Sequence, residues 1–159
     1  MATPRMQPMY DFYMKLKAHP IGGDFFQCAV RASMTLRHVG VYDPRSYRAC
    51  GYATSHGWAL RAEELYQWLW RKSSLGAAQI IRCTRPAQVP RRHGIIYLRN
   101  CFRRKRGARY RTGDHMDLML WFRKSGPWIL SALRWPKHCT NDIILNCADG
   151  KIRFWPCLW

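Results

Sequence analysis

The stretch FFQCAVRAS, residues Phe25–Ser33, constrains the fold of this chain more than any other. A turn with two glycines, Ile21–Asp24, leads into it, and its small and aliphatic residues then recur with the spacing of an α-helix. The thiol of Cys28 is therefore predicted on the first turn of a helix, where unpaired backbone N–H groups and the positive end of the helix dipole favour the thiolate. The alternative is a cysteine that only packs, because free cysteine is among the most buried residue types.

Length and composition indicate a folded chain with a core of its own. The 159 residues are 48% hydrophobic and include eight tryptophans, which argues against disorder. Because no repeat, low-complexity tract or linker interrupts them, we predict one domain over residues 1–159. No apolar run is long enough to span a membrane, and the N-terminus lacks the apolar core of a secretory signal peptide. We therefore expect neither a membrane span nor export by the general secretion route.

The charge is strongly positive, with 27 Lys+Arg against nine Asp+Glu and a formal net charge of +18. Such a field attracts polyanions but does not choose among nucleic acid, anionic lipid and acidic polymers. The densest basic run is FRRKRGARYR, residues 102–111. It is either a solvated flap or an arm that contacts phosphates through Arg and Lys, with Phe102 and Tyr110 available for stacking. Because most charge runs are simply solvated, a basic nucleic-acid-binding module is the alternative function, and nucleic acid is not the partner we expect.

Seven cysteines allow up to three disulfides with one thiol left over. In an oxidising compartment Cys28 is the natural unpaired one, whereas in the cytosol all seven would be reduced. No Cys-x-x-Cys pair or zinc-finger spacing of Cys and His occurs, so we expect no structural zinc site.

Hydrophobic periodicity and turn residues predict helices first and strands afterwards. The helices are expected over residues 8–18, from Cys28 to about residue 38, and over 61–70, and the strands over 79–83, 94–98, 115–122 and 152–159, with the last docked on the sheet. Residues 128–135 fit either a strand or a helix.

A histidine at the start of a predicted strand supplies a base for the thiol. His115 follows a Gly-Asp turn, and the alternation of the strand places Asp117 on the same face. A cysteine on an early helix with a histidine on a strand roughly ninety positions later is the papain-like arrangement. The imidazole there takes the thiol proton, and a third polar group fixes its tautomer. The alternative is a core histidine bonded to a backbone carbonyl, which is less attractive because Asp114 and Asp117 flank it.

Four stretches of the chain resemble the type VI secretion amidase effectors, family four, which are papain-like peptidoglycan amidases that one bacterium injects into another. The helix RAEELYQWLW also falls where that family has one. The resemblance covers essentially the whole chain and implies an α+β, papain-like (NlpC-type) cysteine peptidase fold, with N-terminal helices packed on an antiparallel sheet. The four stretches are QCAVRAS at 27–33, GIIYL at 94–98, GDHMDLMLW at 113–121 and RFWPCLW at 153–159.

By this resemblance Cys28 is the nucleophile and His115 the general base and later acid, with no cofactor and no metal. The backbone N–H of Cys28 and the side chain of Gln27 are candidate oxyanion donors. The implied substrate is the γ-D-glutamyl–diaminopimelate bond of peptidoglycan stem peptides, cut through an acyl-enzyme. The resemblance also implies delivery without a classical signal peptide, action in the periplasm of a target bacterium, where disulfides can form, and an immunity protein, expected to be acidic to match the +18 charge.

The chain departs from the family pattern in two places. The tryptophan expected directly after HMDL is Met119, with Trp121 two positions late, and the acid expected about eleven positions after the histidine is replaced by Gly126. Asp117 is a local substitute, but strand residues two apart lie roughly 6.5 Å apart and point in parallel, which makes a direct Asp–His bond awkward. We therefore favour Asp142 as the group that orients the histidine and Asp117 as a supporting acid.

Overall fold

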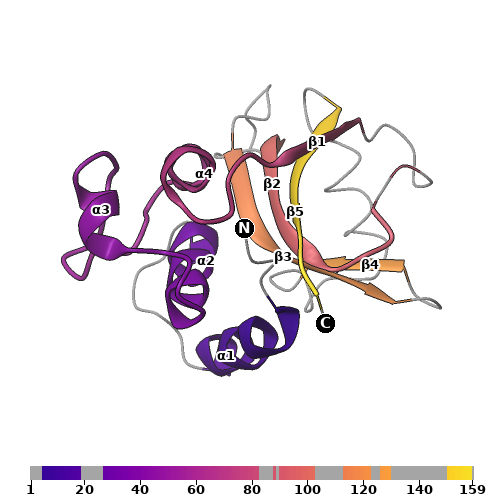
Figure 1. The fold of residues 1–159 in the computed structure, drawn as a ribbon, viewed down its shortest axis with the longest axis horizontal. Helices are drawn as coiled ribbons and strands as arrows, with labels where there is room; N and C mark the ends of the chain where they lie inside the picture. The colour runs from indigo at the N-terminus through magenta and orange to yellow at the C-terminus, as the bar shows by residue number, and fades with distance from the viewer. Residues whose placement is uncertain are drawn as a thin grey trace.

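The helices precede most of the strands along the chain and form a layer of their own. A computed structural model describes residues 5–18, 27–82, 88, 90–102, 113–122, 126–129 and 150–158. In Figure 1 the helices lie together on one side of the molecule and the twisted sheet lies on the other. The fold is α+β, as the sequence predicts. The elements are α1 (Met6–Ala18), α2 (Gln27–His38), α3 (Pro44–Arg48), α4 (Ala62–Lys72), β1 (Gln79–Arg82), β2 (Gly94–Phe102), β3 (Gly113–Phe122), β4 (Gly126–Ile129) and β5 (Lys151–Pro156).

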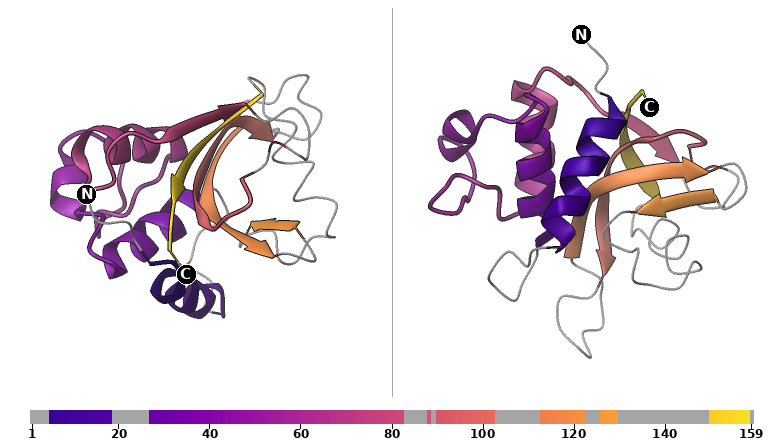
Figure 2. Two further views of the ribbon diagram at one scale, coloured as in Figure 1. Left: turned by 45° about the vertical axis from the view of Figure 1, so that its right-hand side comes forward. Right: turned by 90° about the horizontal axis from the view of Figure 1, so that it is seen from below.

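The sheet is antiparallel throughout, with the strand order β1-β5-β2-β3-β4. The C-terminal strand β5 is thus inserted between β1 and β2, which confirms that the tail docks on the sheet (Figure 2). This insertion brings β5 so close to β2 that a Cβ on Gly94 would lie 2.5 Å from the carbonyl oxygen of Trp155. Only glycine fits such an approach without a shift of the backbone.

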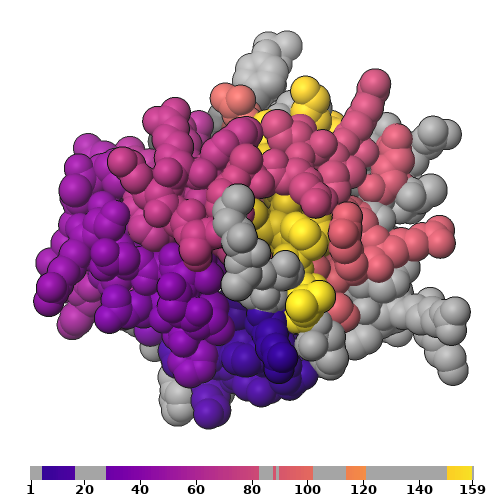
Figure 3. Space-filling view, in the orientation of Figure 1, coloured from indigo at the N-terminus to yellow at the C-terminus, as the bar shows by residue number. Residues whose placement is uncertain are grey.

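The two ends of the described chain lie side by side. The backbone N–H of Met6, at the start of α1, donates a hydrogen bond to the carbonyl of Leu158. In Figure 3 the indigo surface of α1 accordingly borders the yellow surface of the C-terminal strand. The start of the first helix is therefore joined to the residues that follow β5.

The helices form layers that lead from α1 to the sheet. Helix α1 packs on α2, and α2 and α4 both pack on β3. The small residues Ala29 and Ala32 on α2 are buried and leave room for close approach between these layers. On α4 the expected positions Leu65, Trp68 and Leu69 are buried, with acidic residues in its first turn and basic residues in its last, as the helix dipole favours. Among the described helices, none is long and apolar enough to cross a membrane.

Helix α3 falls between the helices expected up to about residue 38 and over residues 61–70, in a stretch for which the sequence predicts neither a helix nor a strand. Asp43 caps it by accepting a hydrogen bond from the backbone N–H of Arg45 at 3.0 Å, and Pro44 occupies its first turn. An aspartate followed by proline is a known helix-start signal. The local signal was therefore present, but the abundance of turn formers around it concealed a helix of only five residues.

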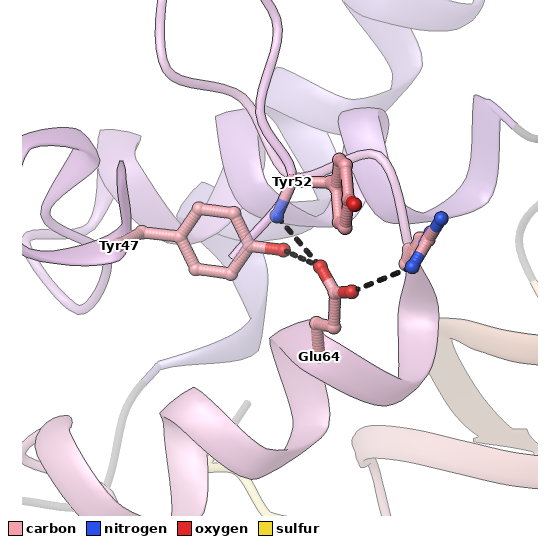
Figure 4. A network of polar contacts seen from close by, with 4 residues as sticks. Tyr47, Tyr52 and Glu64 are labelled. Atoms are coloured by element: carbon pink, nitrogen blue, oxygen red, sulfur yellow. Dashed lines mark hydrogen bonds and ion pairs between the residues drawn. The ribbon is translucent and has the colours of Figure 1, made fainter. Parts of the chain in front are cut away.

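A carboxylate on α4 holds the segment that follows α3. Glu64 accepts hydrogen bonds from the backbone N–H of Tyr52 at 2.7 Å and, at a long 3.5 Å, from the hydroxyl of Tyr47, and it pairs with Arg61 at 3.1 Å (Figure 4). The hydroxyl of Ser33 on α2 accepts a further bond from the backbone of this segment. These contacts join α2, α3 and α4 through the segment that connects α3 to α4.

Two predictions fall mostly outside the described residues. Of the basic run 102–111 only Phe102 is described, as the last residue of β2, so the nucleic-acid alternative stays a prediction. Of the ambiguous segment 128–135, residues 128 and 129 belong to strand β4.

Candidate active site

Cys28 is the second residue of α2, so its thiol lies on the first turn of a helix, as predicted. The residue is partly buried and packs against the hydrophobic core. No acidic residue stands in this first turn to oppose a negative charge. The backbone N–H of Cys28 is one of the four at a helix start that have no acceptor within the helix. Both the dipole and these free donors favour an anion at this position.

Strand β3 brings His115 to this thiol from far along the chain. Because α2 packs on β3, the imidazole of His115 hydrogen-bonds the thiol of Cys28. The backbone of Met116, the next residue of β3, also hydrogen-bonds the thiol. One strand therefore supplies both a proton acceptor and a backbone contact to a single sulfur atom.

The two groups shift each other's pKa in opposite directions. Burial alone would raise the pKa of Cys28, but the hydrogen bond and charge of His115 and the backbone contact of Met116 outweigh it, so that the pKa is lowered. Burial alone would lower the pKa of His115, but hydrogen bonds to Asp117 and Cys28 and the charges of both outweigh it and raise the pKa to about 10. The pair therefore favours thiolate and imidazolium over thiol and imidazole.

The third member of the cluster is Asp117, which bonds His115 directly. The distance from Nε2 of His115 to Oδ2 of Asp117 is 3.1 Å, and Oδ1 of Asp117 accepts the backbone N–H of Leu118 at 2.8 Å. The carboxylate is almost wholly buried, with 1% of the side chain exposed. With Nε2 engaged in this way, Nδ1 is the ring nitrogen left for Cys28.

The expectation that this bond would be awkward is wrong. Side chains on one strand face lean along the strand direction, so the long imidazole can cross the spacing between positions i and i+2. The bond to Leu118 also turns the carboxylate so that its other oxygen meets the ring. Asp142 lies outside the described residues, as does the side chain of Gln27, although Gln27 itself begins α2.

A β-bulge next to His115 sets the start of β3. The register of β2 and β3 is regular up to the pair Leu98–His115 and shifts between Leu98 and Phe102. Within this bulge Asn100 has a φ of 49°, and its backbone N–H donates to Oδ1 of Asp114 at 2.8 Å. Asparagine tolerates this left-handed conformation better than most residues. Bulges commonly aim side chains at active sites, but the residues around this one carry no pattern that could have predicted it.

The described cysteines differ sharply in their surroundings. Cys28, Cys50 and Cys157 are free thiols that form no disulfide, Cys101 is buried near the end of β2, and the remaining three cysteines lie outside the described residues. Burial raises the pKa of Cys157 to about 12, the opposite of what happens at Cys28. Within the described ranges, no group of three or more His, Cys, Asp or Glu side chains is arranged so that it could hold a metal ion.

The comparison with protein families identifies the class to which this fold and site belong. The family model for the type VI secretion system (T6SS) amidase effector protein 4 matches residues 26–155. The chain belongs to this family, which confirms the resemblance drawn from its four motifs. The family is one of peptidoglycan amidases, so the protein is a hydrolase of that class. No curated protein matches the chain. The matched range includes Cys28, His115 and Asp117, whereas α1 lies before it.

Alkylation by iodoacetamide should modify Cys28 at lower pH than it modifies an ordinary thiol. Because folding lowers the pKa of Cys28, the thiolate persists below the pKa of a free cysteine, and reactivity is lost only as the pH falls through the lowered value. The measurement is the rate of modification across the neutral range by mass spectrometry, with a cysteine peptide as reference. In His115→Ala the profile should move up towards that of the peptide, and a wild-type profile equal to the peptide's would refute the activation of Cys28.

Proposed function

We propose that the protein is a cysteine amidase with one papain-like domain over residues 1–159, which cleaves the γ-D-glutamyl–diaminopimelate bond of peptidoglycan stem peptides. The observation that carries this proposal is the hydrogen-bonded series Cys28–His115–Asp117. A helix that presents the thiol and an antiparallel sheet that presents the imidazole support the papain-like assignment. The assignment of the third group moves from Asp142 to Asp117, since Asp117 reaches the ring without any rearrangement.

Each residue has a defined part in the reaction. The thiolate of Cys28 attacks the γ-carbonyl carbon of the D-glutamyl residue, and the carbonyl oxygen becomes an oxyanion. The backbone N–H of Cys28, with Gln27 as a second donor, stabilises this charge. The imidazolium of His115 then gives its proton to the departing amine of diaminopimelate, and the C–N bond breaks to leave a thioester on Cys28.

Hydrolysis of the thioester uses the same groups in reverse roles. His115, now neutral, takes a proton from water as the oxygen attacks the thioester carbon, and the carboxylic acid and the thiolate are released. Asp117 keeps the ring oriented through both half-reactions, because its bond to Nε2 leaves Nδ1 directed at the reacting atoms. Since Asp117 is buried and held by the backbone of Leu118, it has little freedom to turn away.

The charge of the protein suits an acidic polymer as substrate and an acidic protein as inhibitor. Stem peptides carry free carboxylates, and a net charge of +18 raises the local concentration of such polyanions. Membership of a T6SS amidase effector family supports action in the periplasm of a target cell. We expect an acidic immunity protein that covers the site, and a neutral or basic inhibitor would count against electrostatic matching.

Digestion of purified disaccharide-tetrapeptide tests the bond assignment. We expect two products by mass spectrometry. One is a disaccharide-dipeptide that ends in D-glutamate, and the other is a dipeptide that begins with a free diaminopimelate amine. A matched substrate with the α-linked isomer of glutamate should resist cleavage, because the attacked carbonyl is then displaced from the thiolate. Cleavage between the lactyl group and L-alanine instead would overturn the proposal.

A further inference from the structure

One face of helix α1 is fully buried, and the last of its three buried residues, Tyr13, carries a hydroxyl group. Met6, Met9 and Tyr13 follow one another at helical spacing, and all three have no exposed surface. The first two are apolar, but the hydroxyl of Tyr13 is buried without a partner at full hydrogen-bond geometry. Burying a hydroxyl in this way is unfavourable, and phenylalanine would fill the same space without that cost. A tyrosine at this position therefore needs another explanation.

The hydroxyl of Tyr13 faces the carboxylate of Asp117. Apart from burial, Asp117 has the strongest influence on this hydroxyl, both through its charge and as a hydrogen-bond acceptor. The charged groups of α2 that also influence it are Arg31 and Cys28. Burial and Asp117 together raise the pKa of Tyr13 well above its ordinary value. The group is thus an O–H donor and not a phenolate at neutral pH.

Asp117 already accepts the backbone N–H of Leu118 at Oδ1 and the ring of His115 at Oδ2. A carboxylate has lone pairs for further donors, and a third donor would hold both its orientation and its charge. Hydrogen bonds of active sites are often long or poorly aligned in the free enzyme, where they already act on the groups they join, and they shorten when substrate binds. The hydroxyl of Tyr13 acts on the carboxylate of Asp117 but does not meet full hydrogen-bond geometry, as is common for such bonds.

We propose that Tyr13 is a positioning residue, whose hydroxyl donates to Asp117 and so keeps that carboxylate aligned with His115. The proposal rests on the function proposed for Cys28, His115 and Asp117. It also assigns a role to α1, which precedes the residues matched by the family model. The path from Tyr13 to the reacting sulfur runs through Asp117 and His115, so the residue acts through others and does not touch the substrate.

The test is Tyr13→Phe, which removes the hydroxyl and nothing else. We expect kcat on stem-peptide substrate to fall about tenfold with little change in KM, as for the loss of one hydrogen bond to a charged group. The Tm should change little, because phenylalanine fills the same buried space and the hydroxyl is not at full hydrogen-bond geometry in the free enzyme. With one donor fewer the anionic site binds protons more readily, so the acid limb of the kcat/KM profile should move to higher pH.

Alkylation of Cys28 gives a second measurement that needs no substrate. In Tyr13→Phe the acid limb of the alkylation rate of Cys28 should also move to higher pH. The reason is that Asp117 supports the imidazolium of His115, which lowers the pKa of the thiol. If stem peptides proved not to be the substrate, this shift would still support the role of Tyr13. An unshifted alkylation profile would overturn it, whatever the substrate.

The matched control is Tyr47→Phe. Tyr47 is equally buried, but its hydroxyl faces Glu64 on α4, away from Asp117. We expect Tyr47→Phe to leave the pH profiles of kcat/KM and of Cys28 alkylation unchanged. Its Tm can fall slightly, because the contact with Glu64 is lost. Equal pH shifts in the two variants would show a general loss of packing and would overturn the assignment of Tyr13.

Discussion

Replacing Cys28 by alanine will lower the hydrolysis of purified stem-peptide fragments by about 10⁴-fold or more and leave the fold intact. The reaction proposed here forms its thioester on this sulfur, so no other group can take over the step. Cys28 is partly buried, and alanine removes only the sulfur atom and is a good helix former, so we expect little loss of stability. The measurement is the initial rate of product release by liquid chromatography, with Tm and circular dichroism recorded for the same preparations.

The chain offers a matched control for this variant. Cys50 is an exposed free thiol on the segment after α3, where its sulfur contacts backbone carbonyls of Ser46 and Tyr47. Cys50→Ala should retain full activity. A Cys28→Ala enzyme that still works within tenfold of wild type would end the proposal of a cysteine nucleophile, and a loss of activity in both variants would point to damaged folding instead.

The second large effect is expected for Asp117→Asn, which should lower kcat/KM by roughly 10²- to 10⁴-fold. Asp117 accepts two hydrogen bonds with its two oxygens, from Leu118 and from His115. An amide has one oxygen and one NH2 group, so one of these donors would face another donor. The variant also removes the negative charge that raises the pKa of His115, so the imidazolium needed to protonate the departing amine becomes less stable.

Asp142→Asn distinguishes the two candidates for the orienting acid. With Asp117 in that role, Asp142→Asn should change kcat/KM by less than about tenfold, as for a charge outside the site. Both variants should be assayed with the same substrate, and their Tm values compared with that of the wild type. A severe loss in Asp142→Asn beside a mild one in Asp117→Asn would reverse the assignment and restore the preference drawn from the sequence.

Elements whose signals lie within a few residues of one another were predictable. The helix that carries Cys28, the apolar face of α4 and the strand that carries His115 all follow from local spacing, and the structure places each close to its expected bounds. Even α3 had a local signal in Asp43 and Pro44. Such elements are predictable because backbone geometry repeats at short intervals, so a few neighbouring residues decide which side faces the core.

Contacts that depend on side-chain direction were not predictable in the same way. The direct bond of His115 to Asp117 depends on how far the two side chains lean along the strand. From the sequence alone, the two side chains are expected to point in parallel and not to meet. The bulge at Asn100 depends on a hydrogen bond to Asp114, fourteen positions later. Tyr13 occupies a position on α1 that reads as an ordinary core position, and only the packing of α1, α2 and β3 places its hydroxyl near Asp117.

The sequence alone predicted which residues carry the proposed chemistry, and the kind of element on which Cys28 and His115 lie is as predicted. It placed a thiol at a helix start and an imidazole at the start of a strand, because those positions follow from local periodicity. Only the tertiary structure decided that α2 rests on β3, so that the thiol meets the imidazole, and which acid holds the ring. Meetings of this kind depend on packing between residues far apart in the chain and on rotamers that differ by about 1 kcal/mol, and neither leaves a periodic trace in the sequence.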